Sequence, residues 1–186
     1  GECGEDSYRE LIAQELGVDP QSILGMDMYL YNRTAPSIWG AKEEFISSPK
    51  LDDLQCACTS LKAMIQAEND RCVTVYACFD NEEVGSGTKQ GASSTFLRDV
   101  LQRINDGLGF DGEDYRRAVA GSFMVSCDNA HAVHPNHPEK TDAENCTWMN
   151  KGIVIKFSAN QKYTTDGIRC AVFAGLCRDA GVPVQY

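Results

Sequence analysis

The segment VTVYACFDNEEVGSG, residues 73–87, joins an apolar run directly to a group of acidic side chains. Residues 73–79 have the β-branched, aromatic and apolar composition of a buried strand. Asp80, Glu82 and Glu83 follow at once. Neighbouring carboxylates repel one another, and their charged forms are costly to desolvate unless a positive charge lies nearby. The segment therefore predicts either a cation site at the end of a buried strand or a solvated turn.

Apolar runs alternate with amphipathic patterns along the rest of the chain. The strand patterns cover residues 25–32, 71–79, 119–127, 152–160 and 182–186. The helix patterns cover residues 6–18, 51–66, 91–106 and 165–181, and residues 32–43 read as a loop. Ser7 and Glu10 fit a capping box, and Gly17 and Gly181 fit helix stops. This order predicts an α/β fold in which a mixed sheet carries helices on both faces.

Composition restricts the class of protein. The 186 residues suffice for one domain, with 42% hydrophobic and 24% charged residues. A net charge of -10 argues against nucleic-acid partners, which require a basic face. No run of 18 apolar residues is present, so we predict no membrane partner.

The cysteines predict a reducing compartment. They number nine, which is odd, and no pair has the spacing of a zinc knuckle or a redox motif. The nine are Cys3, Cys56, Cys58, Cys72, Cys78, Cys127, Cys146, Cys170 and Cys177. We interpret them as free thiols that pack in the core of a cytoplasmic protein.

A second predicted strand also ends in an acid. Asp128 follows residues 119–127, and all three histidines of the chain come within the next nine residues. Sites in open α/β sheets form beyond the carboxyl ends of strands, so the two acidic groups are expected to meet. Asp52 and Asp53, at the start of a helix, add two carboxylates. Such a set suits zinc or another divalent ion. Spacing alone predicts four ligands: Glu83, Asp128, His131 and His134.

Two adjacent glutamates suit a metal hydrolase. One carboxylate can bind the ion while its neighbour takes a proton from a metal-activated water. Gly85 and Gly87 would allow the tight backbone that such a turn needs. The structural alternatives are a capped or solvated turn, an exposed Lys156 on a polar strand face and a Tyr163 that only packs against the next helix.

Four segments, in this order, resemble the aspartyl aminopeptidase family of di-zinc exopeptidases. They are FISSPKLDDL (45–54), FDNEEVGSGTKQGASSTFL (79–97), SCDNAHAVHPNHPEKTD (126–142) and NKGIVIKFSANQKYTTDG (150–167). The resemblance implies a metal-dependent aminopeptidase that removes N-terminal Asp or Glu from peptides and uses two divalent ions, zinc first among them. It also implies a zinc-exopeptidase (phosphorylase/hydrolase-like) catalytic domain and self-association into a large homo-oligomer such as a dodecamer.

The resemblance implies a role for each matching residue. Asp52 would bridge the two ions, Glu83 and Asp128 would each bind one, and Glu82 would be the general base. The residues implied to bind substrate are His131, Lys156 and Tyr163, and this replaces the spacing-based prediction for His131. A lysine near an acidic substrate side chain makes physical sense, since an ammonium pairs with a carboxylate in a partly desolvated pocket.

The sequence also departs from the family. The family has an early HxD motif and a metal-binding histidine near its C-terminus, and this sequence contains neither. We expect residues 1–40 to be the end of an inserted dimerisation domain with its return linker, and residues 41–186 to be part of a catalytic domain. The chain would then belong to a longer polypeptide or be a truncated relative, inactive alone if nothing replaces the histidines. Two other functions stay open: a non-catalytic scaffold or subunit, and a di-metal aminopeptidase with another first-residue preference.

Overall fold

The computed structural model describes residues 4–186, in two compact units. One unit comprises the chain up to Pro49, and the other is Lys50–Tyr186. This boundary lies nine residues after the one expected at residue 40, and the assignment of residues 1–40 to a dimerisation domain stays a prediction. No helix within residues 4–186 has the length and hydropathy that crossing a membrane requires.

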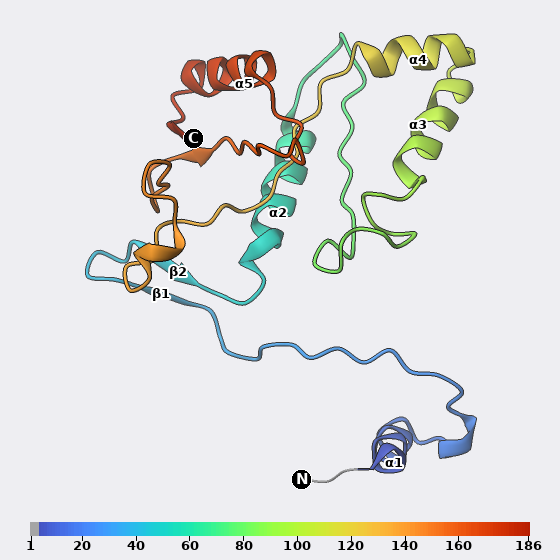
Figure 1. Cartoon of the computed structure of the whole chain (residues 1–186). Coiled ribbons are helices and arrows are strands. Elements are labelled where there is room, and N and C mark those ends of the chain that lie inside the picture. Colours follow the sequence, from blue (N-terminus) through green and yellow to red (C-terminus); the bar gives the residue numbers. More distant parts are fainter. Residues whose placement is uncertain (1–3) are drawn as a thin grey trace. The chain divides into compact units, whose positions relative to one another are not determined.

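The first unit begins with helix α1, Glu5–Leu16 (Figure 1). Gly17 ends α1 in the left-handed conformation, with a φ of 66°, as predicted. The predicted capping box is wrong, because Gly4 is the N-cap and Ser7 lies inside the helix, where its hydroxyl donates to the Gly4 carbonyl at 2.6 Å. A short 3₁₀ helix, η1 (Pro20–Ser22), follows.

The rest of the first unit differs from the prediction. Residues 25–32, predicted as a strand, pair with no strand in the described chain, and Leu30 is fully exposed. The predicted loop instead contains β1, Ser37–Trp39, which pairs antiparallel with β2, Phe45–Ser47. The Trp39 and Phe45 rings, with centroids 4.9 Å apart, stabilise this hairpin. Aromatic cross-strand pairing was the signal that sequence reasoning missed.

The second unit contains four α-helices. They are α2 (Leu51–Gln66), α3 (Phe96–Gly107), α4 (Gly112–Ala120) and α5 (Gly167–Asp179), with a short 3₁₀ helix, η2 (Pro138–Lys140). Helices α2 and α5 agree with the predicted ranges to within two residues, and α3 begins at Phe96, five residues after its predicted start. Helix α4 was missed, although Asp111 and Asp114 form a reciprocal capping box at its start.

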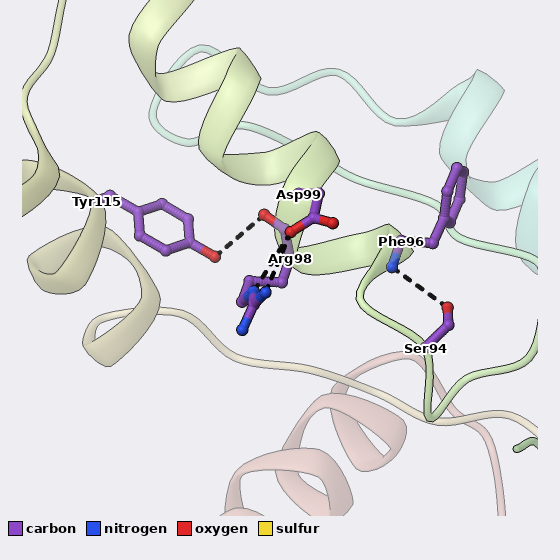
Figure 2. A network of polar contacts seen from close by, with 5 residues as sticks. All are labelled: Ser94, Phe96, Arg98, Asp99 and Tyr115. Atoms are coloured by element: carbon purple, nitrogen blue, oxygen red, sulfur yellow. Dashed lines mark hydrogen bonds and ion pairs between the residues drawn. The ribbon is translucent and has the colours of Figure 1, made fainter. Parts of the chain in front are cut away.

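Helices α3 and α4 form a hairpin held by polar contacts. The buried Asn105 amide donates to the carbonyls of Phe110 at 3.2 Å and Asp111 at 2.9 Å, which closes the connecting turn. The Tyr115 hydroxyl of α4 donates to the Arg98 carbonyl of α3 at 3.4 Å (Figure 2). The Ser94 hydroxyl accepts from the first amide of α3 in the same view.

The α/β class is confirmed, but the sheet is smaller than predicted. Strand β3, Ile153–Val154, pairs in parallel with β4, Val184–Gln185, and the buried Ile155 extends the pairing by donating its N–H to Gln185. Residues 73–79 and 122–127 run as extended traces without ladder partners in residues 4–186, whereas Val119 and Ala120 of the second predicted strand end α4 (Figure 1). The apolar composition of these extended segments indicates that they can be buried, but a strand also needs a second strand beside it to form ladder hydrogen bonds.

The apolar face of α5 that was predicted to point inward is exposed. The face of α5 predicted to point inward has Ile168, Val172 and Leu176 exposed by 79%, 48% and 59%. The predicted inward face is therefore wrong, because the covered side of α5 carries Cys170 and Phe173, which are half-buried, and Cys177, which is buried. The eight described cysteines are free, as predicted, but Cys58, Cys72, Cys78 and Cys127 are exposed, so the expected core packing is wrong for them. Cys3 lies outside the described residues.

Candidate metal centre

Three carboxylates gather at the start of α2. Asp52, Asp53 and Asp128 each place a carboxylate oxygen within 4.8 Å of the others, and we call them the acid cluster. Adjacent side chains on a regular helix diverge by about 100°. Asp52 and Asp53 instead have non-helical backbone angles (φ -85°, ψ 115° and φ -113°, ψ 19°). Asp53 therefore joins the cluster, although it is not among the predicted metal ligands.

The electrostatics of the acid cluster favour a cation. Partial desolvation, followed by the charge of Asp128 and a hydrogen bond with it, raises the pKa of Asp52 above its ordinary 3.8. Asp53 and Glu83 raise the pKa of Asp52 further, so Glu83 lies within electrostatic reach of Asp52. Like-charged groups at this spacing disfavour their joint ionisation, and a bound cation would relieve that repulsion.

Lys156 supplies positive charge beside the acid cluster. Its ammonium donates to Asp128 Oδ2 at 2.7 Å and to the Asn129 carbonyl at 2.8 Å. The side chain is 27% exposed, and its nitrogen lies 5.9 Å from the centroid of the Tyr163 ring. Lys156 is thus a half-buried residue in contact with a predicted metal ligand, not the free surface lysine of the structural alternative.

The two extended segments dock on α2 through polar contacts. The Tyr76 hydroxyl donates to the Ala57 carbonyl at 2.9 Å, and this fixes residues 71–79. The Asn129 amide donates to α2 at Leu51, and its oxygen accepts from Cys56 Sγ at 3.0 Å. Burial, followed by a hydrogen bond with Asp53, raises the pKa of Cys56 to about 12, so its thiol stays protonated and unreactive at neutral pH.

The acidic loop that follows residue 79 is fixed by its own backbone. Asp80 N–H donates to the Gln90 carbonyl at 3.1 Å, and Ser93 N–H donates to Ser86 at 3.2 Å. Gly85 adopts a φ of 95°, as the predicted tight turn requires. Gly91 is also required in this loop, because a Cβ there would lie 2.1 Å from the Ser86 carbonyl oxygen.

This loop presents Glu82 and Glu83 with their side chains exposed. Both residues belong to the same turn, in which Gly85 N–H donates to the Glu82 carbonyl at 2.8 Å. Adjacent side chains on a backbone held in this way can serve two different tasks. Their roles as general base and metal ligand stay predictions.

A pocket of about 660 Å³ adjoins the acid cluster through Lys156. His131, Lys156 and Tyr163, the three predicted substrate-binding residues, all line it, together with Asp142 and Tyr186. The carboxylate of Asp142 is already bonded within its own turn, because it accepts from Glu144 N–H at 2.9 Å and from the Asn145 amide at 3.0 Å. The pocket therefore offers Lys156 as its cationic side chain.

The histidines do not join the acid cluster. Within residues 4–186, Asp52, Asp53 and Asp128 form the one group of three His, Cys, Asp or Glu donors that lie within 4.8 Å of each other. His134 Nδ1 accepts from Asn136 N–H at 3.1 Å, and its ring lies 5.2 Å from that of His137. The ligand set predicted from spacing, which was Glu83, Asp128, His131 and His134, therefore does not converge, since Asp128 is its one member in the acid cluster.

Comparison with known proteins gives a consistent result. Residues 4–186 match the family described as Aminopeptidase I zinc metalloprotease (M18). The chain is 48% identical over 181 residues to a probable M18 family aminopeptidase 2 of Clostridium acetobutylicum, covering 97% of this chain and 42% of the relative. It is 39% identical over 177 residues to aspartyl aminopeptidase 1 of Schizosaccharomyces pombe, covering 92% and 37%.

Solved structures agree with the sequence relatives. The cryo-EM structure of the Ape4 and Nbr1 complex matches with a TM-score of 0.84 and 37% identity, over 97% of this chain and 37% of that one. The mApe1 dodecamer of Saccharomyces cerevisiae matches with a TM-score of 0.76 and 29% identity, over 96% and 42%. The chain spans about two fifths of the length of the relatives it matches.

Proposed function

Because the chain belongs to the M18 family of zinc aminopeptidases, we propose that it forms part of a metal-dependent enzyme that removes N-terminal Asp or Glu from peptides. One observation carries this proposal: Lys156 bonds the acid cluster through Asp128 and also lines the pocket that contains His131 and Tyr163. An anion-rich centre that could hold metal thus lies beside a pocket with a cationic group. The S. pombe relative named as an aspartyl aminopeptidase supports the acidic preference.

The residues present fit a divalent ion. Carboxylate oxygens are suitable ligands for zinc, and three lie within 4.8 Å of one another. Partial desolvation and then the negative charges of Asp128, Asp53 and Glu83 raise the pKa of Asp52, and a bound cation would favour its ionised form. Asp52 would help to hold both zinc ions, and Glu83 and Asp128 would each help to hold one, with Asp53 beside them.

In the proposed reaction, zinc would supply Lewis acidity and lower the pKa of water. Glu82 takes a proton from the attacking water and returns it to the nitrogen of the leaving peptide. Lys156 pairs with the carboxylate of the first substrate residue, while His131 and Tyr163 line the same pocket and orient it. Glu82 is exposed, which suits a base that must reach the attacking water. Lys156 is half-buried, which suits a group that pairs with the substrate carboxylate away from bulk water.

We extend the proposal to assembly and compartment. A solved relative is described as a dodecamer, which supports a homo-oligomer for the whole protein. The eight described cysteines form no disulfides, which supports a cytoplasmic location.

Hydrolysis of N-terminal substrates tests the proposed function. We expect the intact protein with zinc or cobalt to cleave aspartyl and glutamyl chromogenic substrates at least about 10-fold faster than leucyl or lysyl ones, since a charge-assisted bond contributes about 1.5–3 kcal/mol. A chelator should abolish the activity, and added metal should restore it. Equal rates on aspartyl and leucyl substrates would support another first-residue preference. Metal binding without any hydrolysis would support a non-catalytic relative.

The Lys156→Met variant is expected to lose about 10–100-fold in kcat/KM on aspartyl substrates, because the charge-assisted bond to the substrate carboxylate is lost. Lys156→Arg, which keeps the charge, should lose less on these substrates. Leucyl substrates should be affected only through the Lys156–Asp128 contact. The matched control is Lys162→Met, which removes an exposed lysine from the same loop. An equal loss on both substrate classes would rule out a role of Lys156 in specificity.

A further inference from the structure

Asn129 bonds three neighbours of the acid cluster with one side chain. Its Nδ2 donates to the Leu51 carbonyl at 3.5 Å and to Gln55 Oε1 at 3.3 Å. Its Oδ1 accepts from Cys56 Sγ at 3.0 Å. Its own carbonyl accepts from Lys156 Nζ at 2.8 Å. Both ends of the amide are thus occupied by partners of matching polarity, which fixes its orientation.

The partners of Asn129 bracket the acid cluster. Leu51 precedes Asp52 and Asp53 in α2, and Gln55 follows them within one turn. Asn129 itself directly follows Asp128, and the segment that carries both residues pairs with no strand in the described residues. These contacts link positions more than 70 residues apart in the chain. The carboxylates repel one another, so their close approach requires attraction from groups beside them.

We propose that Asn129 is the positioning residue of the metal centre, holding Asp52 and Asp53 against Asp128 so that their oxygens converge. This inference rests on the proposed function, because it assumes that the acid cluster binds zinc. Asn129 itself does not touch metal or substrate. It acts through the backbone of α2 and through Lys156, in the way that residues behind metal ligands commonly set ligand geometry.

The alternative is that Asn129 is an ordinary half-buried polar residue whose bonds only satisfy its amide. The two roles differ in what an isosteric change does. Asn129→Asp keeps the shape but directs an oxygen at the Leu51 carbonyl and at Gln55 Oε1, both of which are acceptors. It also adds charge beside Asp128. A residue needed only for packing would tolerate this change far better than one that sets the geometry of the cluster.

Zinc affinity, measured by competition with a colorimetric chelator, tests the proposal in the intact protein. We expect Asn129→Ala and Asn129→Asp to bind zinc about 10–100-fold more weakly, the usual effect of removing a residue that supports metal ligands. Cobalt-substituted variants should show altered visible absorption bands. The matched control is Asn145→Ala, whose amide bonds only Asp142 within its own turn and should leave zinc affinity within about 2-fold of wild type.

The outcomes separate this inference from the proposed function. Wild-type zinc affinity in both Asn129 variants, or an equal loss in Asn145→Ala, would overturn the positioning role alone. Absence of zinc binding in the wild-type protein would overturn both. If the Ala variant does not fold, Asn129→Asp, which preserves the packing volume, carries the test. Circular dichroism of the metal-free variants confirms that affinity, not folding, has changed.

Discussion

The Glu82→Gln variant is expected to hydrolyse aspartyl substrates about 10²–10⁴-fold more slowly than the wild-type protein, with unchanged zinc affinity. Glutamine is isosteric with glutamate but cannot accept the proton of the attacking water. The turn does not depend on the carboxylate, because its bonds are made by backbone groups such as the Glu82 carbonyl and Gly85 N–H. Steady-state kinetics at saturating zinc measure the effect, which should appear in kcat and not in KM.

Glu83→Gln is the matched comparison, since it removes the same charge one residue later. We expect it to weaken zinc binding and to regain activity as zinc is raised, because Glu83 is assigned as a ligand. Excess zinc should not rescue Glu82→Gln. Rescue of both variants by zinc would reassign Glu82 as a ligand, and full activity of Glu82→Gln would leave the general base elsewhere.

The fold was predictable where the signals are local. Helices α2, α3 and α5 follow from apolar residues at helical spacing, and the Gly17 stop follows from the cost of a left-handed backbone for other residues. Strands were less predictable because pairing is not local. Residues 71–79 and 119–127 have strand composition without ladder partners in residues 4–186, and β1 of the β1–β2 hairpin lies in a segment predicted as a loop.

Some residues of the candidate site were predictable from local sequence, and others depend on contacts between distant segments. Asp128 was found because it ends an apolar segment, and Lys156 and Tyr163 were found only through resemblance to a family. Asp53 is not among the predicted ligands, because its place depends on backbone angles that a helical pattern does not predict. Asn129 gave no signal, since contacts with Leu51, Gln55 and Cys56 exist only once α2 and the segment after residue 127 lie side by side.

Asp52→Asn is expected to remove the stabilisation of the protein by zinc. Zinc at 100 times its Kd should stabilise the wild-type protein by about 2.7 kcal/mol, which raises the Tm by about 5–10 °C. Loss of the bridging carboxylate should reduce this shift to near zero. Asp70→Asn, an exposed acid outside the cluster, is the matched control and should keep the full shift. Differential scanning calorimetry with and without zinc measures both.

Without metal, the Asp52→Asn substitution should raise the Tm of the protein and not lower it. Because the folded protein raises the pKa of Asp52, its contribution to stability is fully present below the ordinary pKa of 3.8 and is lost as the pH rises through the raised value. Asparagine has no such loss, so the metal-free variant should have a higher Tm than wild type at pH 7 and a similar Tm below pH 3.8.

These two shifts separate a metal ligand from a structural acid. A carboxylate that serves folding would lower the Tm of the metal-free protein when it is replaced, through the loss of its hydrogen bonds. A carboxylate kept for metal destabilises the metal-free fold, through repulsion from Asp128, Asp53 and Glu83, and stabilises it only when a cation is bound. A lower metal-free Tm in Asp52→Asn, or an undiminished zinc shift, would contradict the assignment of Asp52 as the bridge.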